Sequence, residues 1–304
     1  MKILVATDLS APSDEAVRQA HARAKPGDQL AVVHVIPNLQ PVAPLFPQST
    51  QQTILDVAAL PARAEEAVRD RVAELTGRSD DAFEVFIEQG VDYAEVARRA
   101  AAWHADLVVI GSRGSTGLER VLLGSVAERV ARYATCPVLV ARHVPDASAK
   151  GPVVAATDLS DPSLPALEAA VREASHLGAP LVAVHAVDAG PTNLLYGAGL
   201  LTGTVPFALL PGVIDQLKSA AKAALTEAMD TAKASGEARV DVGDAAAAVV
   251  RAAIESHARL VVVATHGRTG LRRVAMGSVA EAIVRTAPCP VLVTRHVDHA
   301  HSSH

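Results

Sequence analysis

The sequence predicts an α/β protein of two tandem domains, each a Rossmann-like, doubly wound parallel sheet of five strands. Apolar runs such as DLVVIG and RLVVVA alternate with Ala-rich stretches, which is the pattern of strands buried between helices. This pattern also occurs twice, because residues 111–143 and 264–296 are identical at 20 of 33 aligned positions. The front of each half repeats as well, as VATDLSAPS at 5–13 and AATDLSDPS at 155–163.

The first half begins with KILVAT, an apolar run too short for a secretion signal, which we interpret as a first strand. Further runs rich in Val, Ile and Leu follow it, separated by Ala-rich helical stretches. The strands are expected near 2–7, 29–36, 82–88, 106–111 and 137–142. The helices are expected near 13–25, 62–76, 92–104 and 125–134.

The second half repeats this order. Its strands are expected near 152–157, 180–187, 238–242, 259–264 and 290–295, and its helices near 163–177, 213–235, 245–257 and 278–287. The polar stretch PDASAKGP at 145–152 suits a linker, so the predicted domains are 1–147 and 148–304, with a disordered tail at 297–304. Two long irregular segments, 37–61 and 188–212, follow the second strand of each half and are expected to be lids, partner surfaces or partly disordered loops.

Composition excludes several classes of protein. A net charge of −5 and a pI near 6.2 give no reason to expect a nucleic acid or an anionic membrane as a partner. No apolar run approaches the length of a membrane span. Cys136 and Cys289 occupy equivalent positions of the repeat and are expected to be buried, reduced thiols of a cytoplasmic protein. The C-terminal histidines lack a fixed partner, so no metal site is predicted there.

Gly and Ser residues inside the repeat suggest a phosphate site. Gly111 ends the fourth strand, Gly114 lies in the following loop, and Gly124 and Ser125 come directly before a helix. Glycines allow close backbone approach to a ligand, and a helix start offers unpaired N–H groups to an anion. The alternative for Ser125 is purely structural, because Ser125 and Glu128 have the spacing of a capping box, which Ser278 and Glu281 repeat in the second half. Both interpretations stay open at this point.

The spacing Gly-x2-Gly-x9-Gly-Ser after a strand, with a first strand ending in T-D-x-S, resembles the ATP-binding branch of the universal stress proteins. This resemblance covers the whole chain as a tandem pair. It implies the fold of the adenine-nucleotide α-hydrolase group, and ATP, with or without Mg²⁺, as the ligand. The residues that it implies around the nucleotide in the first half are Ala6, Thr7, Asp8, Val35, Gly111, Arg113, Gly114, Gly124, Ser125 and Val126.

The second half departs from this pattern at its first glycine, which is Ala264. The added methyl group puts close backbone approach in doubt there. The remaining residues that the resemblance implies are Asp158, Ala186, Gly267, Gly277, Ser278 and Val279. ATP binding is therefore expected more firmly in the first half than in the second.

Asp8 and His34 each have a structural alternative. Asp8 could cap the following turn, and in an ATP site it could contact either the ribose or a water molecule bound to Mg²⁺. His34 and His185 lie at equivalent places on the second strands, where we favour a structural role over a catalytic one. Arg113 and His266, in the first glycine loops, could reach a phosphate.

The resulting hypothesis is an ATP-binding stress-response protein with a regulatory role and no dedicated catalytic residue. One alternative is an enzyme of the adenine-nucleotide α-hydrolase group, such as a ligase or adenylyltransferase. It is disfavoured because neither S-G-G-x-D-S nor H-x-G-H follows the first strand. Another is an interaction module without nucleotide. The resemblance also implies that the two CPVLV strands pair the halves inside one chain, and that two chains can form a homodimer.

Overall fold

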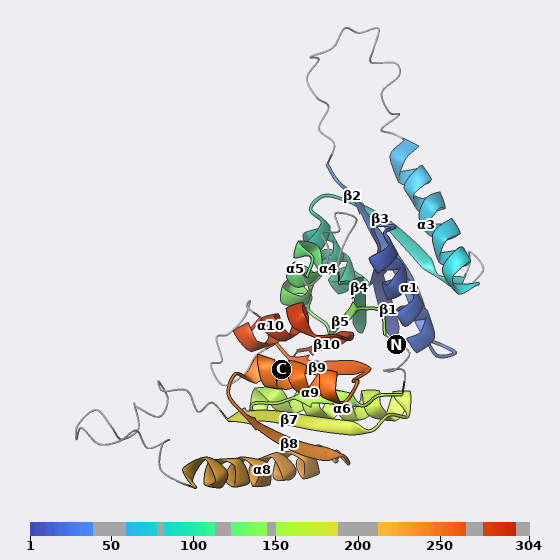
Figure 1. Ribbon diagram of the computed structural model, residues 1–304. Helices are drawn as coiled ribbons and strands as arrows, with labels where there is room; N and C mark the ends of the chain where they lie inside the picture. Colours follow the sequence, from blue (N-terminus) through green and yellow to red (C-terminus); the bar gives the residue numbers. More distant parts are fainter. Residues whose placement is uncertain are drawn as a thin grey trace, which may run out of the picture. The chain divides into compact units, whose positions relative to one another are not determined.

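A computed structural model describes residues 1–38, 59–77, 82–112, 123–144, 150–187, 212–265 and 276–295. The chain forms two compact units, which divide between Ala141 and Arg142. Each unit is an α/β layer structure of its own, with helices on both faces of a parallel sheet (Figure 1). The predicted fold class of two doubly wound, five-stranded domains is confirmed.

The first sheet has the strand order β3-β2-β1-β4-β5, and all of its pairs are parallel. Its strands are β1 (Lys2–Ala6), β2 (Gln29–Ile36), β3 (Glu84–Gln89), β4 (Leu107–Gly111) and β5 (Val138–Ala141). β1, β4 and β5 are almost entirely buried, as expected for apolar strands covered on both faces. Strand order reverses between β1 and β4, which is where open α/β sheets bind ligands.

In the described part of this unit, four helices cover the sheet. α1 (Ala11–Arg23) packs on β1, β4 and β5, and α3 (Leu60–Thr76) packs beside it on β2 and β3. On the other face, α4 (Asp92–Ala102) packs on β2, and α5 (Ser125–Tyr133) packs on α4 and β5. Asp14 of α1 is buried and pairs with Arg71 of α3, whose Nε lies 3.0 Å from the Asp14 Oδ1. This ion pair ties the two helices of one face together.

The second unit repeats the arrangement with the order β8-β7-β6-β9-β10. Its strands are β6 (Val153–Ala156), β7 (Leu181–Val187), β8 (Glu237–Val242), β9 (Leu260–Ala264) and β10 (Val291–Thr294). α6 (Leu164–Leu177) and α8 (Val213–Thr231) cover one face, and α9 (Ala245–Glu255) and α10 (Ser278–Thr286) the other. A 3-10 turn, η4 (Asp161–Ser163), precedes α6 and has no counterpart before α1.

Element boundaries agree with the predicted ones within two residues, except at the end of α8, which stops at Thr231 rather than near residue 235. The long segments 37–61 and 188–212 and the tail at 297–304 lie wholly or mainly outside the described residues. Cys136 and Cys289 are buried and form no disulfide, as predicted. Burial raises the pKa of the Cys289 thiol to about 12, which keeps it protonated at neutral pH. No helix in the described ranges is both long and apolar enough to cross a membrane.

Candidate functional site

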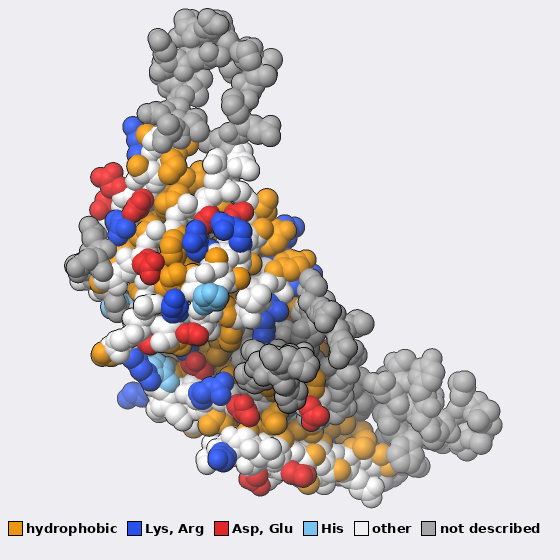
Figure 2. Space-filling model, turned by 180° about the vertical axis from the view of Figure 1, so that it is seen from behind, with side chains coloured by type: hydrophobic (Ala, Val, Ile, Leu, Met, Phe, Trp, Pro, Cys, Tyr) orange, Lys and Arg blue, Asp and Glu red, His pale blue; other side chains and the backbone are white. Residues whose placement is uncertain are grey.

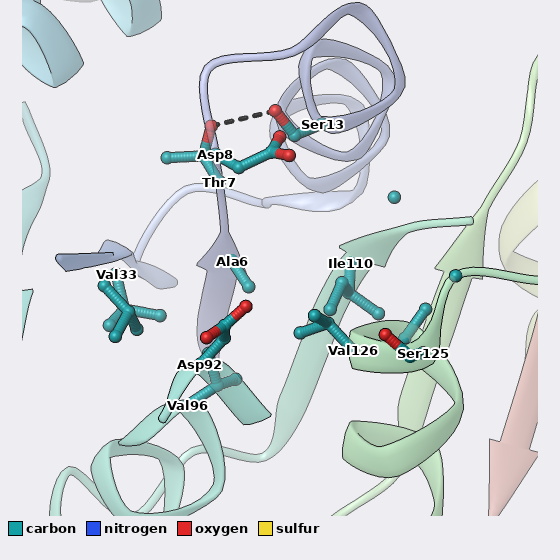
Figure 3. A pocket seen from close by; sticks show the side chains of 14 residues that line it. Ala6, Thr7, Asp8, Ser13, Val33, Asp92, Val96, Ile110, Ser125 and Val126 are labelled. Atoms are coloured by element: carbon teal, nitrogen blue, oxygen red, sulfur yellow. Dashed lines mark hydrogen bonds between the residues drawn. The ribbon is translucent and has the colours of Figure 1, made fainter. Parts of the chain in front are cut away.

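A pocket of about 260 Å³ opens at the carboxyl ends of β1, β2 and β4 in the first unit, next to the reversal of strand order. It collects residues from three strands, β1, β2 and β4, and three helices, α1, α4 and α5 (Figure 3). Its described lining residues are Ala6, Thr7, Asp8, Ser13, Val33, Val35, Asp92, Val96, Ile110, Gly111, Gly124, Ser125, Val126 and Ala127. All of the predicted first-half residues that the structure describes are therefore at this pocket.

The turn after β1 places the Asp8 side chain at the pocket. Asp8 Oδ1 accepts a hydrogen bond from the backbone N–H of Ser10 at 3.1 Å and another from the Ser10 hydroxyl. Between them, Leu9 adopts a left-handed conformation with φ of 62°, which costs roughly 1–2 kcal/mol for a side chain with a Cβ. Asp8 therefore caps the turn after β1, and it also lines the pocket.

The end of β2 presents backbone groups to the same pocket. The N–H of Thr7 bonds to the carbonyl of Val33 at 3.0 Å, and a regular ladder would next join the N–H of Val35 to the carbonyl of Thr7. Instead, Nδ1–H of His34 donates to that carbonyl, at 2.9 Å. The N–H and C=O of Val35 therefore point past the end of β1 into the pocket. His34 is a structural residue, as predicted, and His185 repeats its bond, to Thr157, at 2.9 Å.

Gly111 is needed for helix packing. A Cβ at this position would lie 2.5 Å from the carbonyl oxygen of Pro12 and 3.0 Å from the backbone nitrogen of Ser13. These distances are far inside van der Waals contact, so the first turn of α1 can pack on the end of β4 only where a glycine stands. The sequence suggested that this glycine serves backbone approach to a ligand. The structure shows a tight contact with α1, on a residue that also lines the pocket.

The start of α5 forms another side of the pocket. Gly124 is the N-cap residue, and its own N–H bonds to the carbonyl of Ser112 at 2.8 Å. Ser125 is the first helical residue, so the capping-box interpretation is wrong: the cap has no side chain, and no side-chain cap bond forms. The N–H groups of Ser125, Val126 and Ala127 belong to the first turn, where helical N–H groups lack an intrahelical partner. All three residues line the pocket.

The second unit repeats much of this edge. Asp158 accepts from the N–H of Ser160 at 3.1 Å, and Leu159 has a φ of 63°. Gly277 is the N-cap of α10, and Ser278 and Val279 begin that helix, so the capping-box interpretation is wrong here too. Ala186 lies near the end of β7, at the position of Val35.

The two edges differ beside the first-strand turn. Ala264 stands at the position of Gly111, where a methyl group could not occupy the space beside Pro12 in the first half. In this half the 3-10 turn η4, instead of the first turn of an α-helix, packs on β9, the strand that ends at Ala264. The structure also shows a pocket of about 330 Å³ in this unit, but it lies near the end of α6 and the start of β7, away from the predicted residues.

Three predicted residues, Arg113, Gly114 and Gly267, lie outside the described residues, as does His266. Conversely, no sequence motif marks Asp92 and Val96, which reach the pocket from the start of α4. Ser13 was also missed, although it recurs as Ser163 in the repeat. Its hydroxyl hydrogen-bonds with the Thr7 hydroxyl at 3.0 Å (dashed in Figure 3), and Ser163 makes the same bond to Thr157 at 2.8 Å.

Charge at the pocket comes from two carboxylates, Asp8 and Asp92, and from the positive end of the α5 dipole. Among the described lining residues there is no Lys, Arg, His or Cys. On the face shown in Figure 2, acidic and basic side chains are interspersed over the described surface, in keeping with the small net charge. The pocket can thus offer N–H groups to an anion at one side and acceptors to hydrogen-bond donors at another.

Comparison with known proteins agrees with this architecture. The profile of the universal stress protein family matches residues 1–142 and again 151–295. A universal stress protein of Mycolicibacterium smegmatis is 32% identical over 305 residues, covering 96% of each chain. One from Mycobacterium tuberculosis strain H37Rv is 31% identical over 266 residues, covering 82% of this chain and 78% of its own.

A solved structure shares the fold. The crystal structure of a universal stress protein from Archaeoglobus fulgidus covers 97% of this chain and 98% of its own, with a TM-score of 0.63 at 19% sequence identity. The family profile spans nearly the whole chain in two copies, and each copy coincides with one five-stranded sheet and its helices. The chain therefore belongs to the universal stress protein family, as a tandem pair of its domains, and is a protein of the stress response.

Proposed function

We propose that the first half binds ATP in the pocket at the carboxyl ends of β1, β2 and β4, and that the chain works as an ATP-dependent regulator in the cytoplasm. The observation that carries this proposal is the pocket itself. Its anion-binding helix start, its unpaired strand-edge groups and its apolar wall come together from elements far apart in the sequence. Each of these parts matches one part of an adenine nucleotide.

The first turn of α5 would hold the phosphates. Backbone N–H groups at a helix start, with the positive end of the helix dipole, suit a polyphosphate. The N–H and C=O of Val35 would pair with the N1 and amino group of adenine, with Val33 and Val96 as apolar neighbours. Asp8 would accept from the ribose or hold a water molecule bound to Mg²⁺, and both roles remain compatible with its place at the pocket. Mg²⁺ would supply the positive charge that the described lining residues lack.

We propose binding rather than dedicated catalysis. Catalytic proton transfer or covalent transfer needs a base or an activated nucleophile close to the phosphates. The described side chains at the pocket include hydroxyls, two carboxylates and apolar groups, with no His, Lys or Cys. Slow hydrolysis is compatible with this set. Rapid conversion of ATP to AMP and an adduct would instead favour the ligase or adenylyltransferase alternative.

The second half is a provisional ATP site, because it keeps the helix start at Gly277 and Ser278 but has Ala264 in place of Gly111. Pairing of the halves through the two CPVLV strands, and a homodimer of whole chains, also remain proposals. Light scattering on the purified chain tests the homodimer, since it predicts twice the 31.4 kDa mass of one chain.

Ser125→Pro tests the ATP site with little disturbance of the fold. Proline is tolerated at the first helical position, and Gly124 has the extended backbone, φ −66° and ψ 143°, that a following proline requires. The substitution removes one N–H and one hydroxyl from the pocket. Each hydrogen bond lost to a charged phosphate costs about 1.5–3 kcal/mol, so ATP affinity measured by calorimetry should fall at least about tenfold.

Matched variants complete this experiment. Ser125→Ala removes the hydroxyl alone, so its difference from Ser125→Pro isolates the N–H. Ser278→Pro makes the same change in the second half, where Gly277 has φ −62° and ψ 152°, and it should leave the first site intact. If the wild-type chain binds no ATP at millimolar concentration and releases no nucleotide on denaturation, the proposal of an ATP site is wrong.

A further inference from the structure

Asp92 is a carboxylate at the pocket that no other described residue engages. It is the first residue of α4, and its side chain makes no hydrogen bond to the residues that the structure describes. In Figure 3 it lies beside Ala6 and Val96, and Ser125 lies apart from it across Ile110 and Val126. The pocket therefore has a side that attracts anions, at α5, and a separate side where an acceptor is presented.

The backbone places Asp92 next to the end of β2. Gly90 has a φ of 153°, and its N–H donates to the carbonyl of Ile36 at 3.0 Å. This bond fixes the start of α4 two residues later, beside the strand end that carries Val35. Val35 and Asp92 both line the pocket, and α4 packs on β2, so the two residues lie at the same end of β2.

The second half shows that this carboxylate is not needed to begin the helix. There the equivalent glycine, Gly243, bonds to the carbonyl of Val187 at 2.9 Å, so the approach to the helix is the same. The acidic residue stands one position earlier, as Asp244, and caps α9 by accepting from the N–H of Ala247 at 2.7 Å. The position of Asp92 is taken by Ala245. In the first half the N-cap residue is Val91, whose side chain has no oxygen to accept a hydrogen bond from the helix. The carboxylate stands one position later, as Asp92, and lines the pocket.

We propose that Asp92 selects the base of the bound nucleotide by accepting a hydrogen bond from the 6-amino group of adenine; this rests on the ATP site proposed above. A carboxylate repels phosphates, so the phosphates belong at α5 and the base belongs at the end of β2. The amino group of adenine carries two hydrogens. The C=O of Val35 takes one, and Asp92 takes the other.

The same arrangement rejects 6-oxo purines. In hypoxanthine the amino group is replaced by a carbonyl oxygen, which would face two acceptors, the Val35 carbonyl and the Asp92 carboxylate. Binding free energy is lost more heavily when such an oxygen is buried against two other acceptors than when a hydrogen bond is simply absent. Asp92 therefore works both as an attraction for adenine and as a barrier to inosine nucleotides.

The test compares ATP with ITP, whose base has an oxygen in place of the 6-amino group and a hydrogen on N1. The N1 hydrogen opposes the Val35 N–H equally in every variant, so a change of the ATP-to-ITP ratio on substitution reports Asp92. Binding of both nucleotides is measured by calorimetry on the whole chain, in the wild type and in Asp92→Ala. Removing a negative charge strengthens binding of both triphosphates alike, so the ratio of the two affinities cancels that effect. We expect the wild type to prefer ATP and the preference to fall at least about fivefold in Asp92→Ala.

Two further variants make the result specific. Asp92→Asn keeps the size and can donate as well as accept, so it should bind ITP better relative to ATP than the wild type does. Asp70→Ala removes an exposed carboxylate on α3 and should keep the wild-type ratio. If Asp92→Ala misfolds, as judged by the fluorescence of Trp103, the Asn variant carries the test.

The outcomes separate the two proposals. No binding of either nucleotide by the wild type contradicts the ATP site itself. ATP binding by the wild type with the same ATP-to-ITP ratio in Asp92→Ala and Asp92→Asn contradicts only the role of Asp92. A reduced ratio in both variants, with Asp70→Ala unchanged, supports that role.

Discussion

The two halves of this chain share a strand order and most of the residues of their repeat, but they differ at the edge where ligands bind. The first half has Gly111 at the end of β4 and Asp92 at the start of α4. The second half has Ala264 and Ala245 at these places, and a 3-10 turn, η4, packs on β9 there. The framework of the fold has therefore stayed the same while the pocket positions have changed. The high sequence identity within the repeat therefore reflects the shared fold. Differences at a few positions, such as Gly111 and Asp92, make the ligand-binding edges of the two halves unlike.

Exchanging the glycine and the alanine should have the largest effect on the difference between the halves. Gly111→Ala places a Cβ 2.5 Å from the carbonyl oxygen of Pro12, between two backbone segments that cannot both stay in place. We expect the first half to lose about 3 kcal/mol of unfolding free energy and most of its ATP affinity. Trp103 is the only tryptophan in the chain, so its fluorescence in urea measures the first half alone.

The reciprocal change, Ala264→Gly, should cost the second half only about 1 kcal/mol, the usual penalty for glycine in regular structure. Thiol labelling of Cys289 in urea follows the second half, because this buried thiol becomes accessible when that half unfolds. Equal losses in the two halves would contradict the contact with Pro12 as the reason for the glycine.

The ion pair between Asp14 and Arg71 is another difference between the halves, because Leu164 stands at the position of Asp14 in the second half. Arg71→Leu leaves the buried Asp14 carboxylate without its partner, at a cost of about 2 kcal/mol. In Asp14→Leu the guanidinium of Arg71 loses this partner, but it is partly exposed, so water can solvate it and the loss of stability is smaller. We therefore expect the Trp103 transition to move to lower urea more in Arg71→Leu than in Asp14→Leu. The reverse order would contradict the unpaired Asp14 carboxylate as the main cost of breaking the pair.

Alkaline pH should weaken the second half through Cys289. Burial raises the pKa of this thiol from 9.0 to about 12, so its contribution is complete below pH 9. Between pH 9 and pH 12 the unfolded chain loses the proton and the folded chain keeps it. Stability should fall by about 1 kcal/mol per pH unit in that interval. Circular dichroism in urea at pH 8 and pH 11 measures this, and Cys289→Ala should lose less stability than the wild type over the same range.

Much of the site could be predicted because it lies at strand ends. Parallel strands place all their carboxyl ends at one edge, so Asp8, Val35 and Gly111 follow from the strand assignments and from the resemblance. The start of α5 followed from Gly124 and Ser125, although the identity of the cap did not. Whether Gly124 or Ser125 is the N-cap residue depends on where the helix begins to within one residue, and a capping-box pattern does not determine that.

Other features could not be predicted, because they depend on packing between distant segments. Asp92 is an ordinary acidic residue in the first turn of a helix, and only the tertiary structure brings it to the pocket. Asp14 and Arg71 are 57 residues apart, and nothing in either helix marks them as partners. The contact of Gly111 with Pro12 likewise needs the packing of α1 on β4.

The urea transition of Trp103, measured with and without ATP, shows whether the first half of the chain holds an ATP site. A ligand that binds only the folded first half should raise its unfolding free energy by about 2.7 kcal/mol at a hundred times its dissociation constant. If ATP binds at this site, the transition should shift clearly to higher urea in the wild type and much less in Ser125→Pro. No shift of the wild-type transition up to millimolar ATP would contradict it.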